Sequence, residues 1–238
     1  MTTWDPATAG SHIVLSNGNL TATGSAGGVN NSVRGTTSQN TGKWYFEILI
    51  GGSTFNEQIG VATSALVGSS GLGGGSDNGS ARPTDGSTAV ASSFSLVNAT
   101  GVTWAAGDTM TFAVDFDAGK IWISKNSTWC ASGNPTSGTN PWATFTPNIR
   151  LFPAFSTASS TTDAATLHTS VSTIVYSPPT GFTLWDPPPP VATGPFGFAT
   201  MNAVPLLHPK ILYCHPHRYS EAILSPTTRS RSSQSCAS

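Results

Sequence analysis

The chain has 238 residues, which is enough for one large domain with an extension. Only 9% of the residues are charged, compared with about 25% in an average soluble protein, and Gly, Ser, Thr and Asn take their place. The formal net charge of -1 gives no field that would attract nucleic acid or an anionic membrane, so we expect no nucleic-acid partner. No run approaches the roughly 18 apolar residues of a membrane span, and we expect no membrane insertion.

Charged and aromatic residues are unevenly distributed along the chain. Residues 1–190 have a net charge of -4, residues 191–238 have a net charge of +3, and all seven Trp precede residue 190. These shifts predict a domain at 1–186, followed at 187–238 by a Pro-rich linker and a tail that is disordered or docked on a partner. The tail is either an anchoring arm or poorly selected sequence, such as the product of a frameshift.

The three cysteines, Cys130, Cys214 and Cys236, are widely spaced and odd in number. They predict no disulfide framework and favour a reducing compartment or a virion. The start of the chain, Met1 to Pro6, has neither a basic region nor an apolar run, so we expect no secretory signal peptide.

In chain order, a short apolar strand at Ile13–Leu15 and a weak one after Leu20 lead to the strongest pattern, at Gly42–Ile50. Trp44, Phe46, Ile48 and Ile50 share one face of this strand, while Tyr45, Glu47 and Leu49 share the other. Burying four large apolar side chains is worth roughly 6–12 kcal/mol, at about 1.5–3 kcal/mol each. Such a half-buried strand predicts a second sheet that covers it.

Further short strands are expected at Ile59–Ala62, Val90–Val97, Thr109–Asp117, Ile121–Ser124, Ile149–Phe155 and Thr169–Tyr176. Gly119 is expected to supply the positive φ of a hairpin turn after Asp117. Pro153 indicates an edge strand or a bulge. The Gly- and Ser-rich stretch 67–88 is expected to form a surface loop. With no stretch of helical period, the pattern predicts an all-β antiparallel sandwich.

Five separated segments resemble one family, the PRY–SPRY domains, over roughly residues 4–184. The matching segments are Trp4-Asp5-Pro6 with Ile13–Ser16, Gly42–Glu47, Ile59–Ala62, Val114–Asn126 and Leu151–Phe155. They are similar to the family's "LDP…LVLS" opening, "SG+HYWEVE" strand, "vGva" strand, "LDYE.G.l.FyN" hairpin and "lyPaf" strand. Trp4 departs from the Leu that is usual in that position.

The resemblance implies a bent antiparallel β-sandwich of the concanavalin-like jelly-roll type, without catalysis, that binds partners through variable loops at one end. The abundance of Thr, Ser, Gly and Asn is similar to that of SPRY-like domains in bacteriophage and prophage structural proteins.

Asp115 and Asp117 are the best candidates for a catalytic carboxylate pair, because their spacing places both on the outward face of one strand. The alternative, which we favour, is a polar sheet face that leads into a turn. Glu47 is either paired with Lys43 or Arg34 or satisfied by neighbouring side chains or turn backbone. His12 and His168 have no nucleophile motif around them, so we expect no catalytic residues.

A metal site is not expected either. His208, Cys214, His215, His217 and Cys236 match no common zinc spacing, and we expect no cofactor.

The candidate recognition elements are loops that combine aromatic and polar side chains. Aromatic rings supply contact area at low entropic cost, while Asn, Ser and Gly supply hydrogen bonds. The alternative for the two Trp is that they pack under their own loops. The predicted binding residues are Phe55, Asn56, Glu57, Asp77, Asn78, Trp129 and Trp142.

The sequence thus predicts a non-enzymatic binding or structural module in a phage or prophage virion, as a tail, fibre or surface-decoration component. The expected partner is a protein or a glycan, with other virion proteins or further copies of the chain as additional candidates. The expected location is the virion or the host cytoplasm. A glycan-active enzyme on a concanavalin-like scaffold and an intracellular adaptor that binds a peptide motif remain as alternatives.

Overall fold

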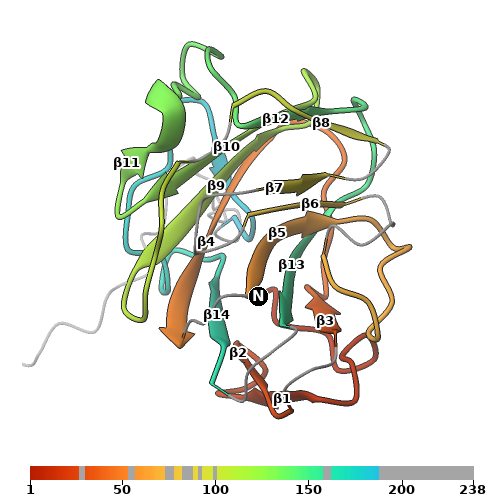
Figure 1. Ribbon diagram of the computed structural model, residues 1–238. Helices are drawn as coiled ribbons and strands as arrows, with labels where there is room; N and C mark the ends of the chain where they lie inside the picture. Colours follow the sequence, from red (N-terminus) through yellow and green to blue (C-terminus); the bar gives the residue numbers. More distant parts are fainter. Residues whose placement is uncertain are drawn as a thin grey trace, which may run out of the picture. The chain divides into compact units, whose positions relative to one another are not determined.

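The computed structural model describes residues 1–26, 30–52, 57–72, 78–81, 88–90, 93–98, 101–157 and 162–187, with backbone alone for 78–81 and 88–90 (Figure 1). The chain divides into one unit, Met1–Pro189, and a second, Pro190–Ser238. Residues 188–238 lie outside the described part, so the tail predicted at 187–238 stays a prediction. Among the described residues, no helix is long and apolar enough to span a membrane.

The larger of two sheets has the strand order β1-β2-β14-β4-β9-β10-β12-β8, with β11 beside β10 and β15 beside β4. Its neighbouring strands are antiparallel, except that β15 pairs with β4 in parallel. The strands are β1 Ile13–Ser16, β2 Thr21–Gly24, β4 Lys43–Gly52, β8 Phe94–Leu96, β9 Thr109–Asp115, β10 Lys120–Lys125, β11 Thr128–Trp129, β12 Ala143–Phe145, β14 Ala164–His168 and β15 Thr183–Leu184.

The smaller sheet is antiparallel and has the order β3-β13-β5-β6-β7. Its strands are β3 Asn31–Arg34, β5 Gln58–Ala62, β6 Asn78–Ala81, β7 Thr88–Val90 and β13 Phe152–Thr157. Figure 1 shows the two layers, with β4, β9 and β10 in one and β3, β5 and β13 in the other. One core cluster draws buried side chains from both sheets, which confirms the predicted antiparallel sandwich.

The predicted central strand is β4, and its inner face follows the two-residue period. Phe46, Ile48 and Ile50 are buried in the core between the sheets. Phe46 lies opposite Phe112 on β9, and the two rings stack with their centroids 4.8 Å apart. Large apolar rings on neighbouring strands therefore anchor the core where β4 and β9 pair.

The outer face of β4 is also buried, because the chain returns across it near its end. We call residues 170–186 the cover segment. Ile174, Phe182 and Leu184 of this segment pack on the outer face, where Phe182 meets the ring of Trp122 edge-on at 6.2 Å. Leu184 belongs to the same cluster, which also contains Tyr45 and Ala113. The expected half-buried strand is thus buried on both faces.

The strand expected at Thr169–Tyr176 is wrong. The preceding residues Ala164–His168 form β14, and the chain turns directly afterwards, with Thr173 N–H donating to Ser170 O at 2.9 Å. Val171 and Val175 are 69% and 58% exposed. Their β-branched side chains suggested a strand, but residues 171–176 form turns and bends, and the segment joins the sheet only later, at β15.

Two other details differ from expectation. Pro153 lies in β13, between β3 and β5, rather than at an edge. Its backbone faces the β3 side, where its carbonyl accepts from Gly35 N–H beyond the last β3 pair, so the missing N–H interrupts no ladder bond.

The stretch 67–88 is only partly a surface loop. Leu72 is buried, and the backbone of β6 extends the smaller sheet.

The sandwich closes where its first residues meet the end of the cover segment. The Asp186 carboxylate accepts from Thr2 N–H at 2.5 Å, from Thr2 Oγ1 at 2.8 Å and from Thr169 Oγ1 at 2.6 Å. Trp4 and Trp185, each followed by Asp-Pro, are both buried in the core. These contacts make residues near 186 part of the folded unit.

Candidate functional site

The candidate site is built on the hairpin that joins β10 to β11. Lys125 pairs with Thr128, so the loop between them has two residues. Asn126 and Ser127 have φ angles of 47° and 65°. Positive φ at both positions defines a type I′ turn, whose twist matches that of the flanking strands. The turn places the side chains on either side of it at one end of the larger sheet.

A polar network fixes this hairpin to the loop that precedes β9. Lys125 Nζ forms an ion pair with Asp108 Oδ2 at 2.8 Å and donates to Thr103 O at 2.9 Å. Asn126 Nδ2 donates to Asp108 Oδ1 at 2.7 Å, and Asn126 Oδ1 accepts from Thr109 N–H at 2.8 Å. The hairpin and the loop therefore hold one fixed relative position.

Asp108 stays ionised because of this network. Burial raises its pKa, but the hydrogen bond from Lys125, the Ala105 N–H, Asn126 and the charge of Lys125 outweigh burial and hold the pKa below its ordinary value. The carboxylate is thus a constant charge at neutral pH, and it keeps the ammonium group of Lys125 in place.

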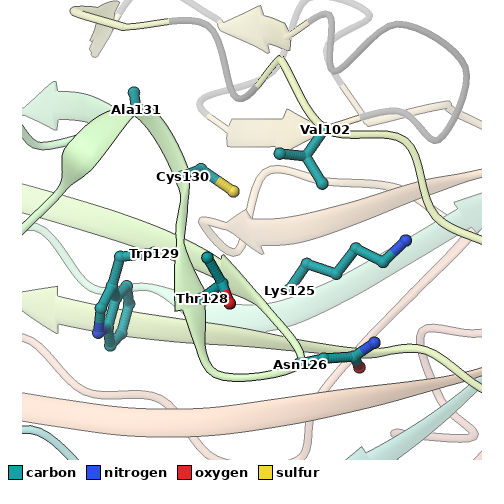
Figure 2. A pocket seen from close by; sticks show the side chains of 7 residues that line it. All are labelled: Val102, Lys125, Asn126, Thr128, Trp129, Cys130 and Ala131. Atoms are coloured by element: carbon teal, nitrogen blue, oxygen red, sulfur yellow. The ribbon is translucent and has the colours of Figure 1, made fainter.

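A pocket of about 380 Å³ lies between the hairpin and this loop (Figure 2). Its size falls within the range of small-ligand pockets, roughly 300–1,000 Å³. Its walls are apolar, formed by the Cys130 thiol, Val102 and the methylene stem of Lys125, and polar groups of Asn126 and Thr128 lie at its edge. This combination suits an apolar group that carries a polar neighbour.

Trp129, a predicted binding residue, is among the residues that line the pocket, but its ring points away from the apolar wall. Figure 2 shows its ring on the opposite side of β11 from the Cys130 sulfur and Val102. The partly buried ring packs with the outer-face cluster that contains Trp122. Its exposed part therefore borders the outer sheet face next to the hairpin, and a role in binding stays a prediction.

Cys130 is a structural wall of the pocket. Its side chain is buried, and burial raises the pKa of the thiol to about 11. The thiol is therefore protonated at neutral pH and acts as a small apolar group.

The other predicted binding residues lie in different places. Trp142 is 2% exposed and belongs to the core, which agrees with the alternative that this Trp packs inside the fold. Glu57 is fully buried, which removes its carboxylate from the surface. Asn78 begins β6, where its backbone lies opposite Ala62. Phe55, Asn56 and Asp77 lie outside the described residues.

The two candidate catalytic carboxylates hold turns. Asp115 lies on the outer face with Ala113 but is buried there, forms an ion pair with Lys43 at 3.1 Å, and accepts from Ala118 N–H at 2.9 Å. Asp117 accepts from Gly42 N–H at 2.9 Å. Gly119 has the expected positive φ of 61°. This arrangement agrees with a polar sheet face that leads into a turn, not with a catalytic acid and base.

Glu47 is a buried carboxylate on the outer face of β4 that accepts several hydrogen bonds. It is fully buried and accepts from Tyr45 OH at 2.7 Å, Val175 N–H at 2.7 Å and Tyr176 N–H at 2.8 Å, with His168 Nδ1 3.9 Å away. Burial would raise its pKa, but the neighbouring His168 and these three donors outweigh burial and lower it. The buried charge is therefore balanced by a neighbouring side chain and by turn backbone, not by a pair with Lys43 or Arg34.

No three His, Cys, Asp or Glu side chains come close enough to share a metal ion within the part of the chain that the structure describes. The residues considered for zinc, His208, Cys214, His215, His217 and Cys236, lie outside that part.

These features define a β-sandwich with a preorganised pocket at a hairpin end. No family model matches the sequence, and no curated protein matches it. Among solved structures, the chain is similar to the SPRY domain of human HERC1, with a TM-score of 0.52 and 18% identity over 69% of this chain and 96% of that one. A second human SPRY domain matches with a TM-score of 0.51 and 18% identity, over 66% and 95% of the two chains. The fold is therefore that of SPRY domains, as the sequence resemblance implied.

Proposed function

We propose that this protein is a non-catalytic recognition module that binds a protein or a glycan through the pocket beside the β10–β11 hairpin. The observation that carries the proposal is the pocket itself, whose apolar walls are held by the Lys125–Asp108–Asn126 network. A partner group that enters it meets fixed walls, so little ordering entropy opposes binding. The SPRY fold supports this function by analogy alone.

The way the carboxylates are used argues for binding rather than turnover. Asp115 and Asp117 are engaged by a lysine and by turn N–H groups, and Glu47 is engaged by the cover segment. A glycosidase needs two carboxyl groups that flank an open site about 5–10 Å wide. The rival proposal of a glycan-active enzyme expects Asp115→Asn and Asp117→Asn to abolish turnover of a glycan, whereas the module expects no change in binding.

We place the module in a phage or prophage virion, as a tail, fibre or surface-decoration component. The low content of charged residues and the abundance of Gly support this setting through composition. Many copies on one particle would raise a weak single-site affinity by multivalency. An adaptor in the host cytoplasm is the alternative, and it expects a monomer that captures one peptide motif.

The experiment compares the full chain with two exposed-residue variants in binding to host-cell surfaces and to a glycan array. Thr128→Arg fills the pocket edge from an exposed position on β11. Ser95→Arg adds the same side chain at an exposed position of β8 in the same sheet and serves as the matched control. Both substitutions are at the surface, so each is expected to change stability by less than about 0.5 kcal/mol.

Saturable binding that Thr128→Arg weakens at least about tenfold, while Ser95→Arg retains it, supports the hairpin pocket as the recognition site. Equal binding by both variants would place recognition elsewhere on the chain. Absence of binding to any surface or array would contradict the recognition function.

A further inference from the structure

A second pocket lies among three segments joined by backbone contacts: the loop before β1, the start of β3 and the loop after Leu66. Gly10 N–H donates to Ser32 O, and Ser32 N–H donates to Gly68 O, both at 2.9 Å. Ser32 Oγ donates to Val67 O at 3.0 Å. A Cβ on Gly10 would lie 2.1 Å from Gly68 O, so the two loops touch through backbone alone. The pocket has a fixed frame.

The pocket has a volume of about 350 Å³ and a polar lining. Its residues are Ser11, His12, Asn30, Asn31 and Ser69. Asn31 is 2% exposed, and its Oδ1 accepts from His12 N–H at 3.1 Å, which fixes the wall between them. Within the described residues, the side chains of Ser11, Asn30 and Ser69 form no hydrogen bond, so their polar groups are free for a ligand.

The described residues that line the pocket carry no carboxylate, ammonium or guanidinium group. An anionic or cationic ligand would lose water without gaining an opposite charge. Hydroxyl and amide groups both donate and accept, so they match a ligand that carries many hydroxyls. The half-exposed ring of His12 adds a flat aromatic face against which C–H groups can pack.

We propose that this pocket binds a neutral saccharide unit. The proposal deepens the recognition function proposed above and rests on it, but it uses different loops from the hairpin pocket. The two sites differ in chemistry, because one is mostly apolar with a polar edge and the other is lined by residues with hydroxyl, amide and imidazole groups. Weak binding of one sugar unit becomes useful when many copies bind one glycan-bearing surface.

The test uses ligand-observed NMR on the full chain with glucose, galactose and N-acetylglucosamine as neutral probes. Glucuronate and glucosamine are the charged counterparts. The double variant Asn30→Ala/Ser69→Ala removes hydrogen-bonding groups from the pocket without breaking a described hydrogen bond. Thr128→Arg, at the hairpin pocket, is the control.

We expect millimolar binding of at least one neutral sugar and much weaker binding of both charged ones. The double variant is expected to weaken the neutral sugar about tenfold or more, since each lost hydrogen bond contributes on the order of 1 kcal/mol. Thr128→Arg is expected to bind the sugar as the parent chain does. A glycan array then distinguishes a terminal sugar of a glycan from a free monosaccharide.

Equal sugar binding by the double variant, preference for a charged sugar, or no sugar binding at all would each overturn this inference. If sugar binding is absent while host-surface binding persists and Thr128→Arg abolishes it, the recognition function stands and only the saccharide pocket is wrong. Loss of both would overturn both proposals.

Discussion

The buried carboxylate of Glu47 is predicted to hold the cover segment on the sheet. Glu47→Gln preserves the volume but replaces one oxygen by an NH₂ group. The side chain then has one acceptor oxygen for three donors that lie 2.7, 2.7 and 2.8 Å from the carboxylate. One or two buried donors lose their partner, at about 1–3 kcal/mol each, so we expect a loss of about 1–6 kcal/mol in the free energy of unfolding. Domains of this kind have roughly 5–15 kcal/mol in total.

The lowered pKa of the Glu47 carboxylate predicts that the stability of the fold depends on pH. Its pKa is lower in the folded protein than its ordinary value of 4.5, so the unfolded chain binds a proton first as the pH falls. The stabilisation is fully present above the ordinary value and is lost as the pH falls through the folded pKa. Glu47→Gln cannot titrate, so its stability is expected to fall less steeply below pH 4.5 than that of the parent chain.

Urea unfolding gives the free energy, and hydrogen exchange of the Val175 and Tyr176 amides reports the local contact. Both amides are expected to exchange faster in Glu47→Gln, because their acceptor is weakened. Asp117→Asn is the control, since Asp117 is exposed and Asn keeps an oxygen for Gly42 N–H. Unchanged exchange of both amides together with an unchanged urea midpoint would refute the reasoning.

Three further substitutions test other contacts. Ser127→Gly is expected to raise the free energy of unfolding by about 0.5–1 kcal/mol, because the φ of Ser127 is 65° and glycine adopts positive φ without strain. Ser95→Gly, in strand β8, is expected to lower it by a similar amount, and urea unfolding of both variants measures the two opposite changes. Gly10→Ala is expected to cost about 1–3 kcal/mol or more, because its Cβ would lie 2.1 Å from a backbone oxygen, and an unchanged melting temperature would contradict the close approach. Lys125→Met removes the ion pair with Asp108 and is expected to cost less than about 1 kcal/mol, with a difference from the parent that shrinks in high salt; a difference independent of salt would argue against it.

Local patterns predicted the centre of the larger sheet well. The two-residue period of Gly42–Ile50 and the turn at Gly119 depend on neighbouring residues, and the structure has β4 and the β9–β10 hairpin there. The turn after Lys125 also has a local origin, because Asn126 tolerates positive φ. These elements needed no knowledge of distant contacts.

The cover segment could not be predicted in this way. Val171 and Val175 have the propensity of a strand, but the backbone of Val175 and Tyr176 is held by Glu47, which lies more than a hundred residues earlier. The hairpin pocket has the same origin, because Val102 and Cys130 meet only after the loop before β9 is fixed by Asp108. Trp142 was predicted to be an aromatic binding residue in a loop, and only the packed sandwich shows that its ring belongs to the core.

Burial on both faces of β4 determines where the sandwich can recognise a partner. The inner face packs against the smaller sheet, and the outer face around Tyr45 and Trp122 lies under the cover segment. A partner that docked on the middle of the larger sheet would have to displace this segment and leave the Glu47 carboxylate without its backbone donors. Recognition at loops and strand ends avoids that cost. Both proposed pockets lie at such places, and both are framed by hydrogen bonds that exist before any ligand arrives.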